Sequence, residues 1–249
     1  MEIWNDTAVI LHVRPYGEGA AVINILAREH GSYAGYVYGA HGKQNILQPG
    51  NLVTVEWKAR LREQLGTFAL ELEKAYASGV MDSPLKLAAL LSACSLAEAA
   101  LPERESNPGQ FEGFKALCDL LQGDQWAEAY ILWEIAFLRE MGFGLDFSKC
   151  AATGTADNLA YVSPRTGRAV SAHAGGPYKE KLLELPGFLT GNLQIGDNNP
   201  YGEILKGLDL TGYFLVNRLF GDTAGPFPEA RISFRSRVEK LAAQGDMDL

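Results

Sequence analysis

The spacing of apolar residues along the chain changes once, near residue 80. Before that point apolar and polar residues alternate, as they do in half-buried β-strands. The alternation is clearest in NLVTVEWKARL and GTFALELE, and the short link EQLG between them predicts a hairpin. The residues expected on the inner face of these two strands are Val53, Val55, Trp57, Ala59, Leu61, Phe68, Leu70 and Leu72.

Three further strands are predicted upstream of this hairpin. They are TAVILHVR, AVINILA and YAGYVYG, and the turns between them, PYGEG and REHGS, contain glycine. Five short strands within the first 80 residues, with little helix between them, favour a small closed barrel. The OB-fold, a five-stranded barrel, is the common architecture of that size.

After residue 80 the apolar residues recur at helical spacing. The pattern predicts helices over 84–101, 109–122, 125–141, 200–220 and 228–243. Residues 144–176 are rich in turn residues and follow no clear period. We therefore expect an α+β protein, with an OB-type barrel domain over 1–80 and a helical domain over 81–249 that has an irregular insert at about 144–176.

Charge is distributed unevenly between these two regions. The chain has a net charge of −8, from 22 Lys and Arg and 30 Asp and Glu. Residues 1–80 hold 7 of the basic and 8 of the acidic residues, so the acid is concentrated in the second region. No signal sequence is visible, no apolar stretch is long enough to span a membrane, and the three cysteines form no short-spaced pair. We expect a cytoplasmic protein.

Enzyme signatures are missing from the sequence. GAHGK at 39–43 lacks the Ser or Thr and the upstream glycine of a phosphate-binding P-loop, and no G-x-S-x-G is present. The four histidines are scattered and show no metalloprotease spacing. The sequence predicts no catalytic residue, although a hydrolase without a known motif stays open.

Lys58, Arg60 and Arg62 lie on the outward face of one predicted strand, where they could follow a phosphate backbone. If the hairpin turn centres on Gln64–Leu65, Lys58 falls opposite Glu71, whereas the two arginines have no acid opposite them. The alternative is that this row is a solvated strand face. Both interpretations stay open at this level.

Two other groups are candidates for nucleic-acid contact. Tyr36 and Tyr38 share one face of their strand and could stack on bases or fill the barrel. Residues 149–181 hold five basic residues against two acidic ones, an exception in the acidic region. The basic residues expected to contact DNA are Arg14, Arg28, Lys43, Lys58, Arg60, Arg62, Arg165 and Arg168.

Three segments together resemble the RecO family of bacterial DNA repair proteins. They are AVILHVRPYGEGAAVINILAREHG followed by YVYGAHG, LWEIAFLREMGFGLDFSKCAATG, and PFPEARISFRSRVEKL. The resemblance implies an OB domain followed by a helical domain, with no enzymatic activity and no cofactor. It implies a recombination mediator that binds single- and double-stranded DNA, anneals complementary strands and, with RecR, loads RecA onto DNA covered by single-stranded-DNA-binding protein.

Many RecO proteins hold zinc in a four-cysteine module, and this sequence departs from that pattern. Cys150 matches the first ligand position, whereas Thr153 replaces the second, and Ser171 and Ala174 stand near the later pair. His173 lies nearby but out of register. Because a structural zinc site needs four good ligands, we expect a degenerate module without metal, in which Cys150 is a small buried residue.

A second function stays open beside the DNA-binding one. The acidic helical region could dock protein partners, with the barrel as an adaptor that makes little direct contact with DNA.

Overall fold

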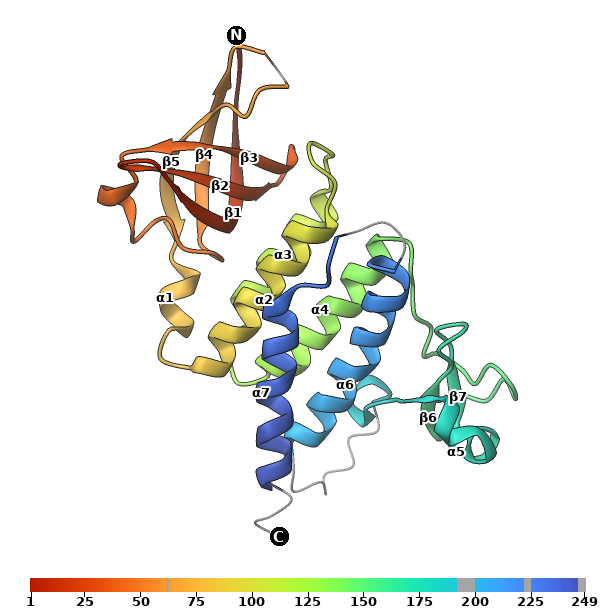
Figure 1. Cartoon of the computed structure of the whole chain (residues 1–249). Helices are drawn as coiled ribbons and strands as arrows, with labels where there is room; N and C mark the ends of the chain where they lie inside the picture. Colours follow the sequence, from red (N-terminus) through yellow and green to blue (C-terminus); the bar gives the residue numbers. More distant parts are fainter. Residues whose placement is uncertain (62, 192–199, 222–224, 246–249) are drawn as a thin grey trace. The chain divides into compact units, whose positions relative to one another are not determined.

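The computed structural model describes residues 1–61, 63–191, 200–221 and 225–245. Contacts between residues divide the chain into two compact units. The first comprises Met1–Trp126 with Pro228–Arg231, and the second comprises Ala127–Phe227 with Ile232–Leu249. Figure 1 shows the barrel at the N-terminal end of the chain and the helices that follow it.

A closed five-stranded barrel forms the N-terminal part of the first unit (Figure 1), in the order β1-β2-β3-β5-β4. Its strands are β1 (Glu2–Tyr16), β2 (Ala20–Ala27), β3 (Gly31–Tyr38), β4 (Leu52–Ala59) and β5 (Thr67–Lys74). Strand β4 pairs back onto β1, while β3 and β5 meet in parallel at the pair Tyr36 and Thr67. The barrel and the helices confirm the predicted α+β class and OB-type architecture.

The inner face of the barrel is the one that the alternation predicts. Trp57 is fully buried, and its indole N–H donates a hydrogen bond to the Leu65 carbonyl at 3.2 Å. The prediction is wrong for Leu61 and Leu72, which are 51% and 37% exposed. Leu61 lies beyond the end of β4. Leu72 lies opposite Val53, next to the irregularity in the β4–β5 pairing between Leu52 and Val53.

The predicted register of the β4–β5 hairpin is also wrong. Lys58 lies opposite Thr67, and Glu71 lies opposite Thr54. The hairpin turn is centred on residues that precede Gln64–Leu65 in the sequence. Each residue of β4 therefore lies opposite a different residue of β5 than predicted. The acid expected beside Lys58 is therefore farther along the barrel.

Three helices complete the first unit: α1 (Tyr76–Val80), α2 (Pro84–Ala100) and α3 (Pro108–Leu120). Helix α2 is joined to the barrel through Glu98, which accepts a hydrogen bond from the Asn24 amide at 2.7 Å and pairs with His12 at 2.9 Å. The Asn107 side chain caps α3 by accepting the Gln110 backbone N–H at 3.1 Å. Helices α2 and α3 thus group with the barrel, while the domain boundary at residue 80 stays a prediction.

The second unit contains most of the remaining helix, in α4 (Trp126–Glu140), α6 (Pro200–Phe214) and α7 (Glu229–Gly245). A π-helical turn, Leu215–Leu219, extends α6. Tyr130 packs edge-on against Phe234 with ring centroids 4.8 Å apart, and both rings are buried. Within the described ranges, no helix has the length and apolar character needed to cross a bilayer.

The insert between α4 and α6 is more regular than its sequence predicts. It contains a sheet in the order β7-β6-β8, formed by β6 (Leu159–Val162), β7 (Ala169–Ser171) and β8 (Leu183–Glu184). Strands of four, three and two residues are too short to show a period. The insert also contains α5 (Ala172–Gly175) and the 3-10 turns Gly176–Lys181 and Gly187–Leu189, and a further 3-10 turn, Ala40–Lys43, follows β3 in the first unit.

Candidate nucleic-acid interface

The strand pairing places predicted contact residues in one row across the outside of the barrel. Successive partners along this row are Arg14, Val22, Tyr36, Thr67 and Lys58. Since neighbouring strands lie about 4.8 Å apart, the row extends roughly 20 Å around the barrel. Three residues that the sequence proposed separately, Arg14, Tyr36 and Lys58, therefore share one outer surface.

Three tyrosines form a continuous strip on this surface, which we call the tyrosine strip: Tyr16, Tyr36 and Tyr38. The ring centroid of Tyr36 lies 5.1 Å from that of Tyr16 and 6.4 Å from that of Tyr38. Tyr16 is 54% exposed and Tyr38 is 65% exposed. Because large apolar groups this exposed are available for contact, the strip is a candidate stacking surface.

Tyr16 and Tyr36 also affect each other's ionisation. The interaction with the Tyr16 hydroxyl, and to a smaller degree burial and Tyr38, raise the pKa of Tyr36, while the positive charge of Arg14 acts in the opposite direction. Tyr36, like any phenol with a pKa of about 10 or above, is uncharged at neutral pH. An uncharged aromatic face beside a cation suits both a base and its phosphate.

Tyr16 is missing from the contacts predicted by sequence. It lies in PYGEG, which reads as a turn, whereas β1 extends through it to pair Tyr16 with Ala20. Ala20 in turn pairs with Tyr38 on its other side. The signal available in the sequence was the two-residue spacing of Arg14 and Tyr16, which puts both side chains on one strand face.

The remaining barrel cations lie at different distances from the strip. Lys43 is next to it, because its ammonium donates a hydrogen bond to the Tyr38 carbonyl at 3.3 Å. Lys58 pairs with Glu56 of its own strand at 2.6 Å. Arg60 is exposed just beyond β4, and no described carboxylate pairs with it. Arg62 lies outside the described residues.

Arg28 does not join this surface. It follows the last residue of β2, whereas the tyrosine strip borders the first residue, Ala20. Its guanidinium pairs with Glu112 of α3 at 2.5 Å and approaches Glu29 at 3.9 Å. Its position fits a link between the barrel and α3.

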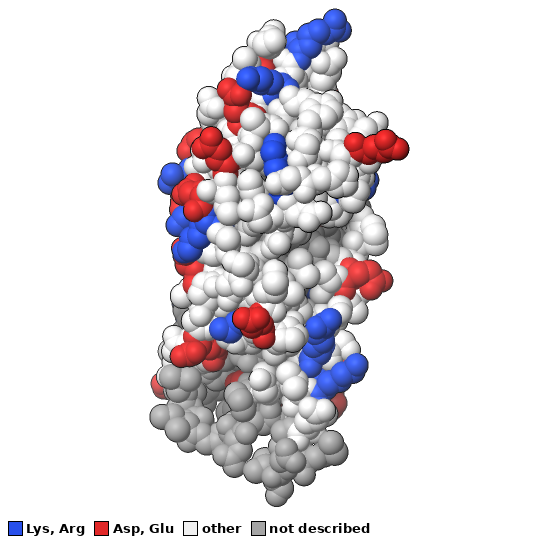
Figure 2. All heavy atoms as spheres, turned by 90° about the vertical axis from the view of Figure 1, so that its left-hand side faces the viewer, with Lys and Arg blue, Asp and Glu red and all other residues white. Residues whose placement is uncertain are grey.

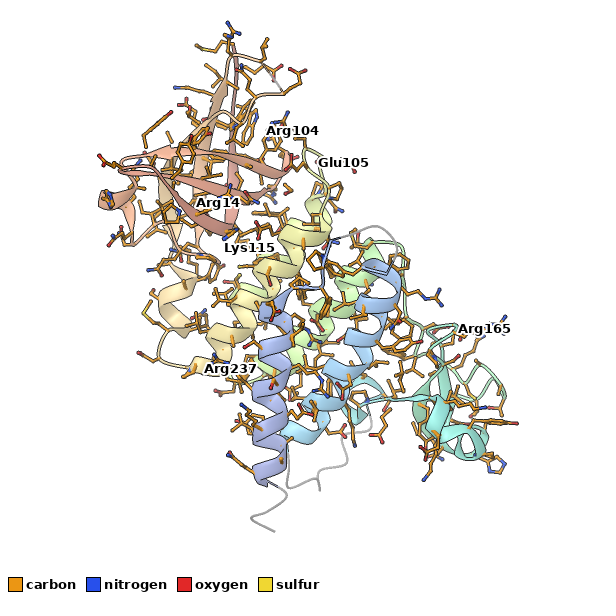
Figure 3. All side chains as sticks on the ribbon, viewed as in Figure 1. Arg14, Arg104, Glu105, Lys115, Arg165 and Arg237 are labelled. Atoms are coloured by element: carbon orange, nitrogen blue, oxygen red, sulfur yellow. The ribbon has the colours of Figure 1, made fainter. Side chains whose placement is uncertain are left out.

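The two arginines predicted from the insert differ in their surroundings. Arg168 approaches Asp146 at 3.6 Å. Hydrogen bonds from Ser148, and then the charge of Arg168, lower the pKa of the Asp146 carboxyl. Arg165 is exposed in the β6–β7 turn (Figure 3), and no described acid pairs with its guanidinium. Of the two, Arg165 is the more accessible to an anion.

Cys150 is buried, 1% exposed, as expected for the degenerate zinc module. Burial raises the pKa of its thiol, but hydrogen bonds from Thr153 and from the Ser171 backbone N–H outweigh that effect and lower the pKa to about 6. The described residues contain no cluster of metal-ligating side chains. Absence of bound zinc stays a prediction, and elemental analysis showing close to one zinc per chain would contradict it.

Charge alone does not define a binding face. On the face drawn in Figure 2, basic and acidic side chains are interspersed over the described residues. A nucleic acid attracted only by charge would meet a mixed surface there. The barrel surface around Arg14 differs because aromatic rings and cations lie together.

Two family models match the chain. The model of the recombination protein O N-terminal region matches residues 1–76, and that of its C-terminal region matches residues 81–224. A protein named DNA repair protein RecO from Rhodospirillum centenum is 53% identical over 241 residues, covering 95% of both chains. The protein of the same name from Caulobacter vibrioides strain NA1000 is 43% identical, and the match covers 94% of this chain and 97% of that protein. The one from Rhodospirillum rubrum is 40% identical, and the match covers 96% of this chain and 98% of that protein.

Proposed function

The chain belongs to the RecO family of DNA repair proteins, and we propose that it acts as a recombination mediator. Membership of the family supports a role in DNA repair and recombination. Beyond that role, we propose that the protein binds single- and double-stranded DNA and anneals complementary single strands. With RecR, it then helps load RecA onto DNA covered by single-stranded-DNA-binding protein. This is a cytoplasmic, non-enzymatic activity.

The tyrosine strip beside Arg14 is the observation that supports DNA binding most strongly. A base stacked on an aromatic side chain contributes about 1–3 kcal/mol, and every base has a face that can stack. Lys43 borders the strip and Arg14 lies within the same row, so a strand whose bases contact the rings has cations near its phosphates. Unpaired bases are needed for stacking, which favours single strands.

The acidic remainder of the chain supports a localised contact. Residues 81–249 hold 15 basic and 22 acidic residues, so most of that region repels a phosphate backbone. The same excess of acid also favours the alternative function, a protein-docking adaptor. Salt separates the two, because DNA binding through phosphates weakens steeply as salt rises.

The proposed activity is tested with two complementary oligonucleotides that carry a fluorophore and a quencher. We expect the protein to accelerate annealing, both for bare strands and for strands covered by single-stranded-DNA-binding protein. Addition of RecR should then allow RecA filaments to form on the covered strand. If annealing is no faster than without protein and no salt-dependent DNA binding is detected, the adaptor function is the correct one.

A further inference from the structure

A small pocket in the second unit lies where the turn after α4, the β6–β7 turn and the end of α6 meet. Its volume is about 180 Å³. Phe143, Leu145 and Phe214 supply its apolar surface, and Arg165 and Arg218 supply its two charges. None of the residues that line it is acidic.

The two arginines are held together by one hydrogen bond. The Arg218 guanidinium donates to the Arg165 backbone carbonyl at 2.9 Å, which fixes the turn that contains Arg165. A guanidinium has five N–H donors, so most of those on Arg218 are not used by this bond. Among the residues that the structure describes, no carboxylate pairs with either arginine. Asp146, close in sequence to Leu145, is already bound to Ser148 and near Arg168.

The backbone on both sides of the pocket has an unusual shape. Arg218 lies in the π-helical turn Leu215–Leu219, a rare conformation that is frequent at functional sites. On the other side, Gly167 has φ +69°, and a Cβ built there would lie 2.9 Å from a Leu145 methyl group. A side chain at position 167 would therefore crowd Leu145, which lines the pocket.

We infer that this pocket binds the terminal phosphate of a DNA strand. A phosphate monoester has a charge of about −1.5 to −2 at neutral pH, which two guanidinium groups can balance. Their planar donor forks also match phosphate oxygens. A phosphodiester within a strand has only one charge, and the apolar surface formed by Phe143 and Leu145 suits the sugar or base of the end nucleotide.

The size of the pocket supports a strand end over a larger occupant. Pockets for drug-sized ligands usually measure about 300–1,000 Å³, and this one is smaller. It can enclose a terminal group but not a continuous strand. The inference rests on the proposed DNA binding, and it adds a contact separate from the tyrosine strip.

Fluorescence anisotropy with short oligothymidines tests the inference. One set ends in a 5′-phosphate, one in a 3′-phosphate, and one in hydroxyl groups at both ends. We expect a terminal phosphate to improve affinity by about tenfold, the effect of one strong charge-assisted contact. The preference should disappear in the double variant Arg165→Ala/Arg218→Ala and weaken in Arg218→Lys, which keeps the charge but loses the fork.

Lys179→Ala provides the matched control, since it removes an exposed charge from the same insert outside the pocket. This variant should keep the preference for a terminal phosphate. If the parent binds all three sets equally, or if the double variant keeps the preference while its urea unfolding matches that of the parent, the inference is wrong.

Calorimetric titrations with mononucleotide separate this inference from the proposed function. Binding of thymidine 5′-monophosphate, but not of thymidine, supports the pocket even if oligonucleotide annealing fails. Binding of N-acetylphenylalanine without binding of thymidine monophosphate would assign the pocket to a peptide carboxylate and overturn the inference.

Discussion

The triple variant Tyr16→Ala/Tyr36→Ala/Tyr38→Ala is expected to bind single-stranded DNA about a hundredfold more weakly than the parent, or worse. Each ring that stacks on a base contributes about 1–3 kcal/mol, and the variant removes three of them. Folding should be largely spared, because Tyr16 and Tyr38 are more than half exposed and exposed substitutions usually change stability by about 0.5 kcal/mol or less. Anisotropy of a labelled oligothymidine measures the loss.

Two further variants separate stacking from other causes. Tyr→Phe at the same three positions keeps the rings and should keep most of the affinity. Tyr178→Ala removes another tyrosine, 62% exposed but in the insert, and should leave affinity unchanged. If the triple Ala variant binds like the parent, the rings are a surface feature without a role in DNA binding.

A second large effect is expected from Gly31→Ala, at the turn into β3. Gly31 has φ +71°, and a Cβ placed there would lie 1.8 Å from the Glu105 carbonyl oxygen. That backbone cannot easily move away, because the Arg104 N–H donates a hydrogen bond to the Ser32 carbonyl at 2.8 Å. Ser32 and Glu103 also form an isolated parallel β-bridge. We expect the free energy of unfolding to fall by about 3 kcal/mol or more, from a strained φ combined with a backbone clash.

Gly17→Ala is the matched control for this substitution. Gly17 also has a positive φ, +58°, but nothing lies within 4 Å of the position that a Cβ would take there. The free energy of unfolding of the Gly17→Ala variant should fall only by the cost of holding alanine at a positive φ, about 1–2 kcal/mol. Urea unfolding followed by tryptophan fluorescence compares the two. Equal losses would mean that the 101–107 loop does not pack against the barrel as the structure has it.

Much of the fold follows from local patterns in the sequence. Burial of Trp57 and Phe68 could be predicted because alternation fixes which strand face is apolar. The helices could be predicted because apolar spacing is a local signal. The residue opposite Lys58 in the β4–β5 hairpin could not be predicted correctly, because the pairing depends on where the hairpin turn is centred.

The candidate sites depend on contacts between distant parts of the chain. Tyr16 and Tyr36 become neighbours only when β1 pairs with β2 and β2 pairs with β3. Arg28 forms its ion pair with Glu112 only because α3 packs beside the barrel. Arg218 lies on a predicted helix, but its position beside Arg165 follows from the insert fold. Periodicity reports the face on which a residue lies, not its neighbour in space.

Photo-crosslinking shows directly whether the tyrosine strip contacts bound DNA. An oligothymidine containing 5-iodouracil is bound to the whole protein, irradiated and digested, and the crosslinked peptides are identified by mass spectrometry. We expect crosslinks at Tyr16, Tyr36 or Tyr38, which increase with the fraction of DNA bound. Efficient crosslinking confined to residues outside the barrel, with none in β1 or β3, would contradict it.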